Sequence, residues 1–218
     1  KKAIGVRVID SNSKVSQDYF AKVVFVSAST LNTNLILLNS KSKRFPNGLG
    51  NDNGLLGKFI AFHNYRATIN AEFEGFPQYT TEGAKPTSHY IPRFRNVYRQ
   101  ETDFLRGYAA GFGAQPNRET NKEGFGAELS NQLLSTKETG VWNVNSHMMG
   151  ETIPKESNLV SLDQEKTDAW GIPLLNIDVD YDDNDEKMIQ DFYEQFSEMY
   201  EKSGFVNIKT NDNGRRPG

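Results

Sequence analysis

Apolar residues along the first forty positions predict a strand, a second strand and a helix in succession. Residues 4–9 are rich in β-formers and precede the turn-forming stretch 10–13. A second run, 19–26, ends in Val-Val-Phe-Val, a pattern typical of a strand buried on both faces, as in a parallel sheet. The helix that follows is predicted by apolar residues at helical spacing, which are Leu31, Leu35, Ile36 and Leu38.

The pattern changes after a glycine-rich loop at 44–58, and a period near two begins at 67–73. Later runs predict further strands at 90–98, 104–112, 141–149, 159–162 and 175–181. Strands separated by Gly, Pro and Asn turns, with few helices between them, favour an antiparallel sheet. The sequence therefore predicts an α+β fold in which an antiparallel sheet of about six strands is covered on one face by helices.

One long helix is predicted at 185–202. Acidic and N-cap residues gather at 183–186, and Ser203 and Gly204 end the helix. The predicted apolar stripe consists of Met188, Ile189, Phe192, Phe196, Met199 and Tyr200. We interpret this stripe as a face that packs on the core.

Composition excludes several classes of protein. The 218 residues include 36% hydrophobic side chains, too many for a disordered chain, and 25 basic against 28 acidic residues give a net charge of −3, which argues against a general nucleic-acid binder. The absence of cysteine excludes a disulfide scaffold, a thiolate nucleophile and a Cys-ligated metal, but leaves the compartment open: bacterial cytoplasm and periplasm both fit. No apolar run approaches the length of a membrane span. From its two ends, we expect the chain to be cut from a larger protein.

Motifs that carry chemistry are mostly absent. The glycines at 48–54 depart from a dinucleotide fingerprint, and 178–189 departs from a calcium loop at its sixth and twelfth positions. His63, His89 and His147 are too dispersed to predict a metal site. Small residues at 27–30 precede the first helix, where backbone N–H groups can face a polar cofactor, although good packing explains them as well.

Two stretches nevertheless resemble a known family. Residues 22–40 are similar to the second signature of the glucose–methanol–choline (GMC) family of flavin oxidoreductases, although Lys41 stands where that signature has Gly. Residues 150–181, which include Pro154, Asn158 and the Asp-x-x-Gly-x-Pro turn at 168–173, resemble the pyranose oxidase and sugar dehydrogenase branch. The resemblance covers nearly the whole chain in the right order.

The resemblance implies a division of the chain. Residues 1–62 would be part of an FAD-binding domain, 63–210 a substrate-binding domain, and 211–218 a truncated return toward the FAD domain. The family's Gly-x-Gly-x-x-Gly and its catalytic His fall outside this chain, so no catalytic residue is assigned. The parent would oxidise an alcohol, with a sugar hydroxyl as the expected group, by hydride transfer to flavin. The fragment itself would be inactive and would hold FAD weakly or not at all.

The resemblance also implies site residues. Cofactor contacts would come from Ser27, Ala28, Ser29 and Thr33. Substrate contacts would come from Tyr90, Arg93, Phe94, Asn145 and His147. The strand pattern agrees for Asn145 and His147, which are two apart and share one face of a strand, opposite Ser146 and Met148.

Alternatives remain open for these residues and for the function. Tyr90 and Phe94 would share one face of a strand, and Arg93 and Arg95 the opposite face. A solvated or ion-paired face explains the two arginines better than substrate contact does. His147 could equally be a satisfied histidine of the sheet. The alternative function is a non-catalytic carbohydrate- or partner-binding module, in which the flavin signature is a coincidence.

Overall fold

The computed structural model describes residues 2–76, 89–116, 124–135 and 140–214, apart from the side chains of 133–135. The chain forms two compact units. Of the described residues, those within 2–61 and 154–180 form unit 1, and those within 62–153 and 181–214 form unit 2. The stretch 154–180, expected within a substrate-binding domain at 63–210, packs in unit 1. The assignment of the units to flavin and substrate domains stays a prediction.

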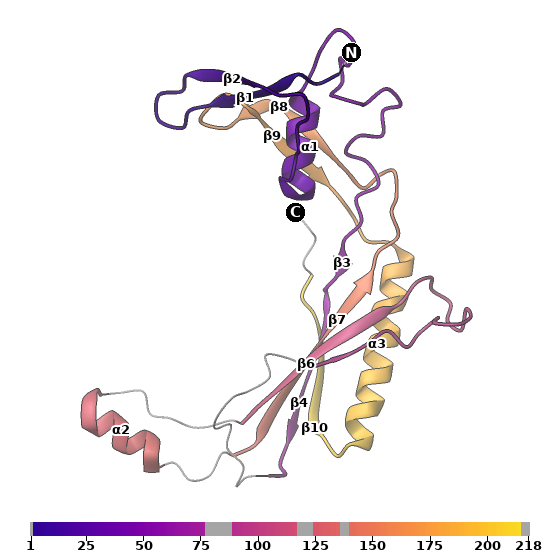
Figure 1. The fold of residues 1–218 in the computed structure, drawn as a ribbon. Helices are drawn as coiled ribbons and strands as arrows, with labels where there is room; N and C mark the ends of the chain where they lie inside the picture. Colours follow the sequence, from indigo (N-terminus) through magenta and orange to yellow (C-terminus); the bar gives the residue numbers. More distant parts are fainter. Residues whose placement is uncertain (1, 77–88, 117–123, 136–139, 215–218) are drawn as a thin grey trace. The chain divides into compact units, whose positions relative to one another are not determined.

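Unit 2 is built on a six-stranded antiparallel sheet (Figure 1), which confirms the predicted fold class. The strand order is β10 (Val206–Asp212), β4 (Ala67–Phe73), β7 (Trp142–Glu151), β6 (Tyr108–Pro116) and β5 (His89–Ile91). The short strand β3 (His63–Asn64) pairs with the far end of β7. The central strand β7 therefore contacts three neighbours, and its alternate residues face the two sides of the sheet.

The long helix α3 (Asp183–Lys202) packs on one face of this sheet, as its predicted stripe requires (Figure 1). Small residues on the sheet, such as Ala67, Ala71 and Ala110, are buried against it and leave room for large side chains from the helix. The buried hydrophobic residues of the helix are Met188, Ile189, Phe192, Phe196 and Tyr200. The predicted core face is confirmed, with Met199 partly buried at its margin.

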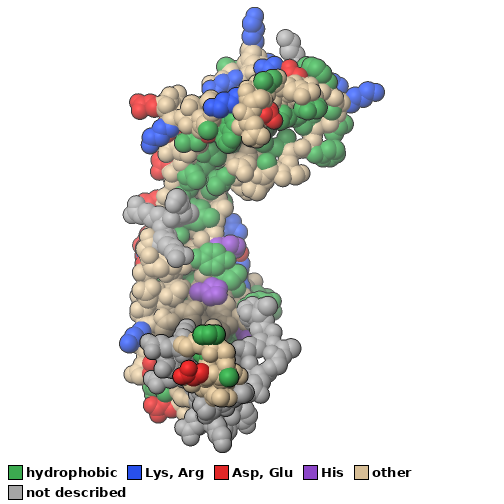
Figure 2. All heavy atoms as spheres, turned by 90° about the vertical axis from the view of Figure 1, so that its left-hand side faces the viewer, with side chains coloured by type: hydrophobic (Ala, Val, Ile, Leu, Met, Phe, Trp, Pro, Cys, Tyr) green, Lys and Arg blue, Asp and Glu red, His purple; other side chains and the backbone are tan. Residues whose placement is uncertain are grey.

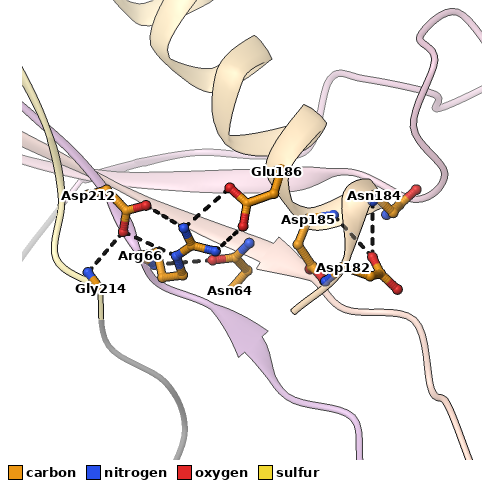
Figure 3. Close-up of polar contacts among 8 residues, drawn as sticks. All are labelled: Asn64, Arg66, Asp182, Asn184, Asp185, Glu186, Asp212 and Gly214. Carbon is orange, nitrogen blue, oxygen red and sulfur yellow. Dashed lines mark hydrogen bonds and ion pairs between the residues drawn. The ribbon is translucent and has the colours of Figure 1, made fainter. Parts of the chain in front are cut away.

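The start of α3 is held by a capping box. Asp182 accepts hydrogen bonds from the backbone N–H groups of Asn184 and Asp185, and Asp185 accepts one from the N–H of Asp182 (Figure 3). These bonds satisfy donors that the helix cannot satisfy internally. The Asp178–Asp182 region is thus the end of a strand followed by a helix cap, as the sequence indicates.

An arginine joins three elements of unit 2 beside this cap. Arg66, just before β4, forms ion pairs with Glu186 of α3 and Asp212 of β10 (Figure 3). Its guanidinium also lies 5.0 Å from the ring centroid of Tyr181. Asp212 is held in turn by the backbone N–H of Gly214 at 2.9 Å. Hydrogen bonding to Arg66 lowers the pKa of Asp212, against the opposing effect of burial.

Two strands of unit 2 differ from their predicted bounds. The strand expected at 90–98 ends at Ile91, because Pro92 has no N–H to donate to a ladder. The strand expected at 104–112 begins only at Tyr108, after Arg106 adopts a positive φ of 71°. Asn96 holds the intervening loop, since its amide donates to the carbonyl oxygens of Phe104 and Arg106. A further helix, α2 (Gly126–Ser135), was not predicted.

Unit 1 consists of two hairpins and one helix. Strands β1 (Gly5–Ile9) and β2 (Ser16–Phe20) pair antiparallel, as do β8 (Leu159–Thr167) and β9 (Pro173–Asp178). The helix α1 (Ser29–Asn39) packs on β8 and β9. The predicted strand at 4–9, the turn after it and the helix are confirmed. Strands β8 and β9 form their own sheet and do not join that of unit 2.

The strand expected at 19–26 is wrong beyond Phe20, where β2 ends. Residues 21–28 have no regular secondary structure, and the side chain of Phe25 is 88% exposed. A strand is stabilised by its hydrogen-bonded neighbours, and among the described residues none pairs with this segment. The second strand of the chain is β2, which lies earlier than predicted.

Candidate functional site

The candidate site is the face of the unit 2 sheet that lies opposite α3. Along β7, Val144, Ser146 and Met148 are buried on the helix side, whereas Asn145 and His147 point to the other side. The shared face predicted for Asn145 and His147 is therefore present. Figure 2 shows unit 2 from the side away from α3, where histidine side chains lie beside hydrophobic ones.

An amide pair lies at the centre of this face. Asn145 of β7 is directly opposite Asn70 of β4, and its Nδ2 donates to Asn70 Oδ1 at 2.8 Å. This bond leaves Asn145 Oδ1 as an acceptor and Asn70 Nδ2 as a donor. Neither of these two atoms makes a hydrogen bond among the described residues. The pair thus presents one acceptor and one donor side by side, both suited to a hydroxyl group.

His147 occupies space left by a glycine. Gly111 of β6 is directly opposite His147, and a Cβ at position 111 would lie 2.4 Å from its Cε1 and 2.5 Å from its Nε2. The ring therefore lies across Gly111, with Thr68 on its other side in the same cross-strand row. The ring of Tyr65 is 6.2 Å away between centroids. The imidazole is half-buried and makes no hydrogen bond among the described residues, so both nitrogens remain available.

These residues line an open groove of about 830 Å³. Beside the amide pair and His147, its polar residues are Glu72, Gln115, Asn143, Asn207 and Lys209. Glu72 accepts a hydrogen bond from Asn207 at 2.6 Å across β4 and β10. Most of the polar groups are uncharged amides, which can each donate and accept. Such a lining suits a neutral ligand that carries several hydroxyl groups.

The other predicted substrate contacts are placed differently from one another. Tyr90 pairs with Gly111, so it shares the row and the face of His147 and is largely exposed. Arg93 and Phe94 lie beyond the end of β5. The expectation that Phe94 shares a strand face with Tyr90 is therefore wrong, and so is the expectation that Arg93 lies on the opposite face of the same strand. The chain leaves the ladder at Pro92, so the alternation of a strand no longer applies.

Arg93 is engaged by the protein itself. Its guanidinium donates to the carbonyl oxygens of Arg95 at 3.1 Å and Asn96 at 2.6 Å, and it lies 3.6 Å from the carboxylate of Glu151. Arg95 forms a two-pronged ion pair with Asp191 of α3, at 2.6 and 2.9 Å. Both arginines thus have partners in unit 2, in agreement with the ion-paired alternative.

The predicted cofactor residues surround the start of α1 in unit 1. Ser27 and Ser29 are exposed, whereas Ala28 and Thr33 are half-buried. Ala28 occupies the N-cap position, and no side chain caps the helix. The first N–H groups of α1 therefore have no side-chain partner from this cap. This group belongs to unit 1, whereas Asn145 and His147 belong to unit 2.

Sequence reasoning missed part of the groove. Asn70, Gln115 and Asn207 come from three strands and reach the same face only through strand pairing. Their alternation with buried neighbours was a usable signal for β4, where Ile69 and Ala71 flank Asn70. Among the described residues, no group of acidic or histidine side chains could hold a metal ion. Within the same part of the chain, no helix combines the length and apolar character needed to span a bilayer.

Comparison with known proteins relates the chain to a dehydrogenase. It is 31% identical over 231 residues to a 2-methyl-1,2-propanediol dehydrogenase from Mycolicibacterium austroafricanum. The match covers 98% of this chain but only 39% of that protein's length. No family model matches the chain. The chain is thus a distant relative of part of a longer oxidoreductase.

Proposed function

We propose that the chain is the substrate-binding part of an FAD-dependent alcohol oxidoreductase of the GMC type, and that its substrate is a sugar or a related polyol. The groove over Asn70, Asn145 and His147 carries the proposal, because it offers unused donors and acceptors on a rigid sheet. The similarity to an enzyme named for a diol supports an alcohol substrate. Oxidation itself belongs to the longer protein.

The groove supports a polyhydroxylated ligand over a charged one. Lys209 and Glu72 are the charged residues of its lining, and they carry opposite signs. Each hydroxyl of a sugar can donate and accept, which matches the paired amides of Asn70 and Asn145. A simple alcohol would use few of these groups and would leave the other polar atoms of the lining without a partner in the complex.

FAD would supply the hydride acceptor for the oxidation. The residues of this chain fit a partial contact with it, since the uncapped N-terminus of α1 and the small side chains of Ser27, Ala28 and Ser29 let a polar group approach the backbone. Thr33 would lie one turn further along the helix. A few hydrogen bonds of about 0.5–1.5 kcal/mol each are too weak to retain the cofactor. We expect the isolated chain to bind FAD weakly or not at all.

The test is sugar turnover per bound flavin in the whole protein encoded by the gene. His147→Ala and Asn145→Ala should each lower kcat/KM about 10- to 100-fold, or roughly 1.4–2.8 kcal/mol, while flavin content and Tm stay close to wild type. Asn176→Ala, on an exposed position of β9 in unit 1, serves as the matched control and should change nothing. Unchanged turnover in both groove variants would remove this face from the substrate site.

Experiments on the same whole protein distinguish the proposed oxidoreductase from a non-catalytic binding module. A non-catalytic carbohydrate module would bind sugars without flavin and would show no flavin reduction when sugar is added. Bleaching of the flavin absorbance by a sugar under anaerobic conditions would support the oxidoreductase. If the purified whole protein contains no flavin, the flavin part of the proposal fails while the groove can still be tested by sugar binding.

A further inference from the structure

The groove of unit 2 extends well beyond His147 and Asn145. Strand pairing arranges its polar residues in three successive rows, which contain His147, Asn145 and Asn143 of β7. Residues two apart on an antiparallel strand are separated by about 6.8 Å, so the outer two rows lie about 14 Å apart. A single sugar ring over Asn145 and His147 would therefore leave the row of Asn143 without a ligand.

The row of Asn143 consists of polar side chains with unused hydrogen-bonding groups. Asn143 is flanked directly by Glu72 of β4 and by Gln115 of β6. Among the described residues, the side chains of Asn143 and Gln115 make no hydrogen bond. Glu72 accepts a hydrogen bond from Asn207 through one carboxylate oxygen, and the other oxygen remains an acceptor. Three adjoining side chains thus offer both donors and acceptors.

A β-bulge in β10 places Asn207 beside this row. The register with β4 shifts between Val206 and Lys209, so that β10 carries one extra residue there. Asn207 has a positive φ of 52°, a conformation that asparagine tolerates better than most residues do. The bulge allows Ile208 to pack against the core while Asn207 lines the groove and donates to Glu72 at 2.6 Å. Bulges beside binding sites commonly serve to redirect a side chain in this way.

The floor of the groove is open between the rows. On the groove face of β6, Gly111 and Gly113 lie opposite His147 and Asn145, and a Cβ added at Gly113 would meet nothing within 4 Å. Glycine weakens the interior of a strand and often marks the close approach of a ligand. The volume of about 830 Å³ is in the upper part of the range of about 300–1,000 Å³ for sites that hold drug-sized ligands. Two linked sugar rings match that size better than one ring does.

We propose that this groove binds a glycoside of at least two sugar rings, an inference that rests on the proposed function. The ring to be oxidised lies over Asn145 and His147. The second ring lies over the row of Asn143, where Glu72 and Asn207 bind its hydroxyl groups. The second ring adds contacts that a monosaccharide cannot make, so this row sets the preference for the longer sugar.

The test compares monosaccharides with disaccharides in the whole protein encoded by the gene. Glucose, galactose and xylose are measured beside cellobiose, maltose, lactose and xylobiose. At least one disaccharide should have a kcat/KM about 10-fold or more above that of its constituent monosaccharides. If monosaccharides are oxidised and no disaccharide is preferred, the inference fails and the proposed function stands. If no sugar of either kind reduces the flavin, the proposed function fails, and the inference fails with it.

Asn207→Gly provides a second readout. Glycine adopts the positive φ readily, so this variant keeps the bulge and removes only the side chain. It should lower kcat/KM for the preferred disaccharide about 10-fold, leave the value for the monosaccharide within about twofold, and change Tm little. Asn176→Ala, at an exposed position of β9 in unit 1, is the control and should change neither value. Equal losses for both sugars in Asn207→Gly, or no loss for either, would overturn the proposal.

Discussion

The imidazole of His147 lies across Gly111 on the neighbouring strand, in the space that any larger residue at 111 would fill. A Cβ there would stand 2.4 Å from the ring, closer than real Cβ contacts allow. The clash involves the end of a side chain and not the backbone, so the ring would move and the sheet would stay. The glycine therefore decides where a candidate substrate contact lies.

Replacing this glycine should affect activity more than stability. In the whole protein, we expect Gly111→Ala to lower kcat/KM for sugar about 10-fold through the displaced ring, at about 1.4 kcal/mol per factor of ten. Asn176→Ala is the control, because this residue lies at an exposed position of β9 in unit 1 and does not line the groove. Steady-state kinetics and Tm are measured for both variants. Equal losses of kcat/KM in the two variants would contradict the role of Gly111.

The capping box of α3 predicts a clear loss of stability. Asp182→Ala removes the acceptor for two backbone N–H groups, so the free energy of unfolding should fall by about 1 kcal/mol. Asp183→Ala, one residue later, loses an exposed ion pair with Lys187, which should cost about 0.5 kcal/mol or less. Urea unfolding of both variants provides the comparison. A larger effect of Asp183→Ala would show that the cap is unimportant.

The ion pairs of Arg66 predict a response to acid. Hydrogen bonding to Arg66 lowers the pKa of Asp212. The ionised Asp212 therefore stabilises the fold fully at pH values above the ordinary aspartate pKa. This stabilisation is lost as the pH falls through the lowered pKa. Asp212→Asn should therefore cost about 1 kcal/mol at pH 7, and the difference from wild type should close in acid, once the pH has fallen below the lowered pKa of Asp212. Asp103→Asn, on a largely exposed carboxylate, should show little difference at either pH.

Tyr193 predicts a response to alkali. Burial raises the pKa of Tyr193 from 10.0 to about 12. The unfolded chain loses this proton first, so stability falls as pH rises between these values. In Tyr193→Phe this decline should be shallower. At pH 7 the variant should be as stable as wild type or slightly more so, because the buried hydroxyl has no hydrogen-bond partner among the described residues. Thermal unfolding from pH 8 to 11, with Tyr98→Phe as a silent control, tests both statements.

The local sequence pattern alone was sufficient to predict several features of this protein. The stripe of α3, the alternation of β4 and the shared face of Asn145 and His147 follow from side-chain periodicity, which depends on residues a few positions apart. The absence of cysteine and the near-neutral charge exclude whole classes of chemistry from the sequence alone. These features needed no knowledge of which elements meet.

Tertiary structure decided what depends on partners distant in the sequence. Asn70 joins Asn145, and Gly111 makes room for His147, only because β7 pairs with β4 on one side and β6 on the other. The run at 23–26 has the composition of a buried strand but no neighbour here, and a strand exists only within a sheet. Periodicity states which face a side chain takes, whereas pairing and burial depend on what the rest of the chain places beside it.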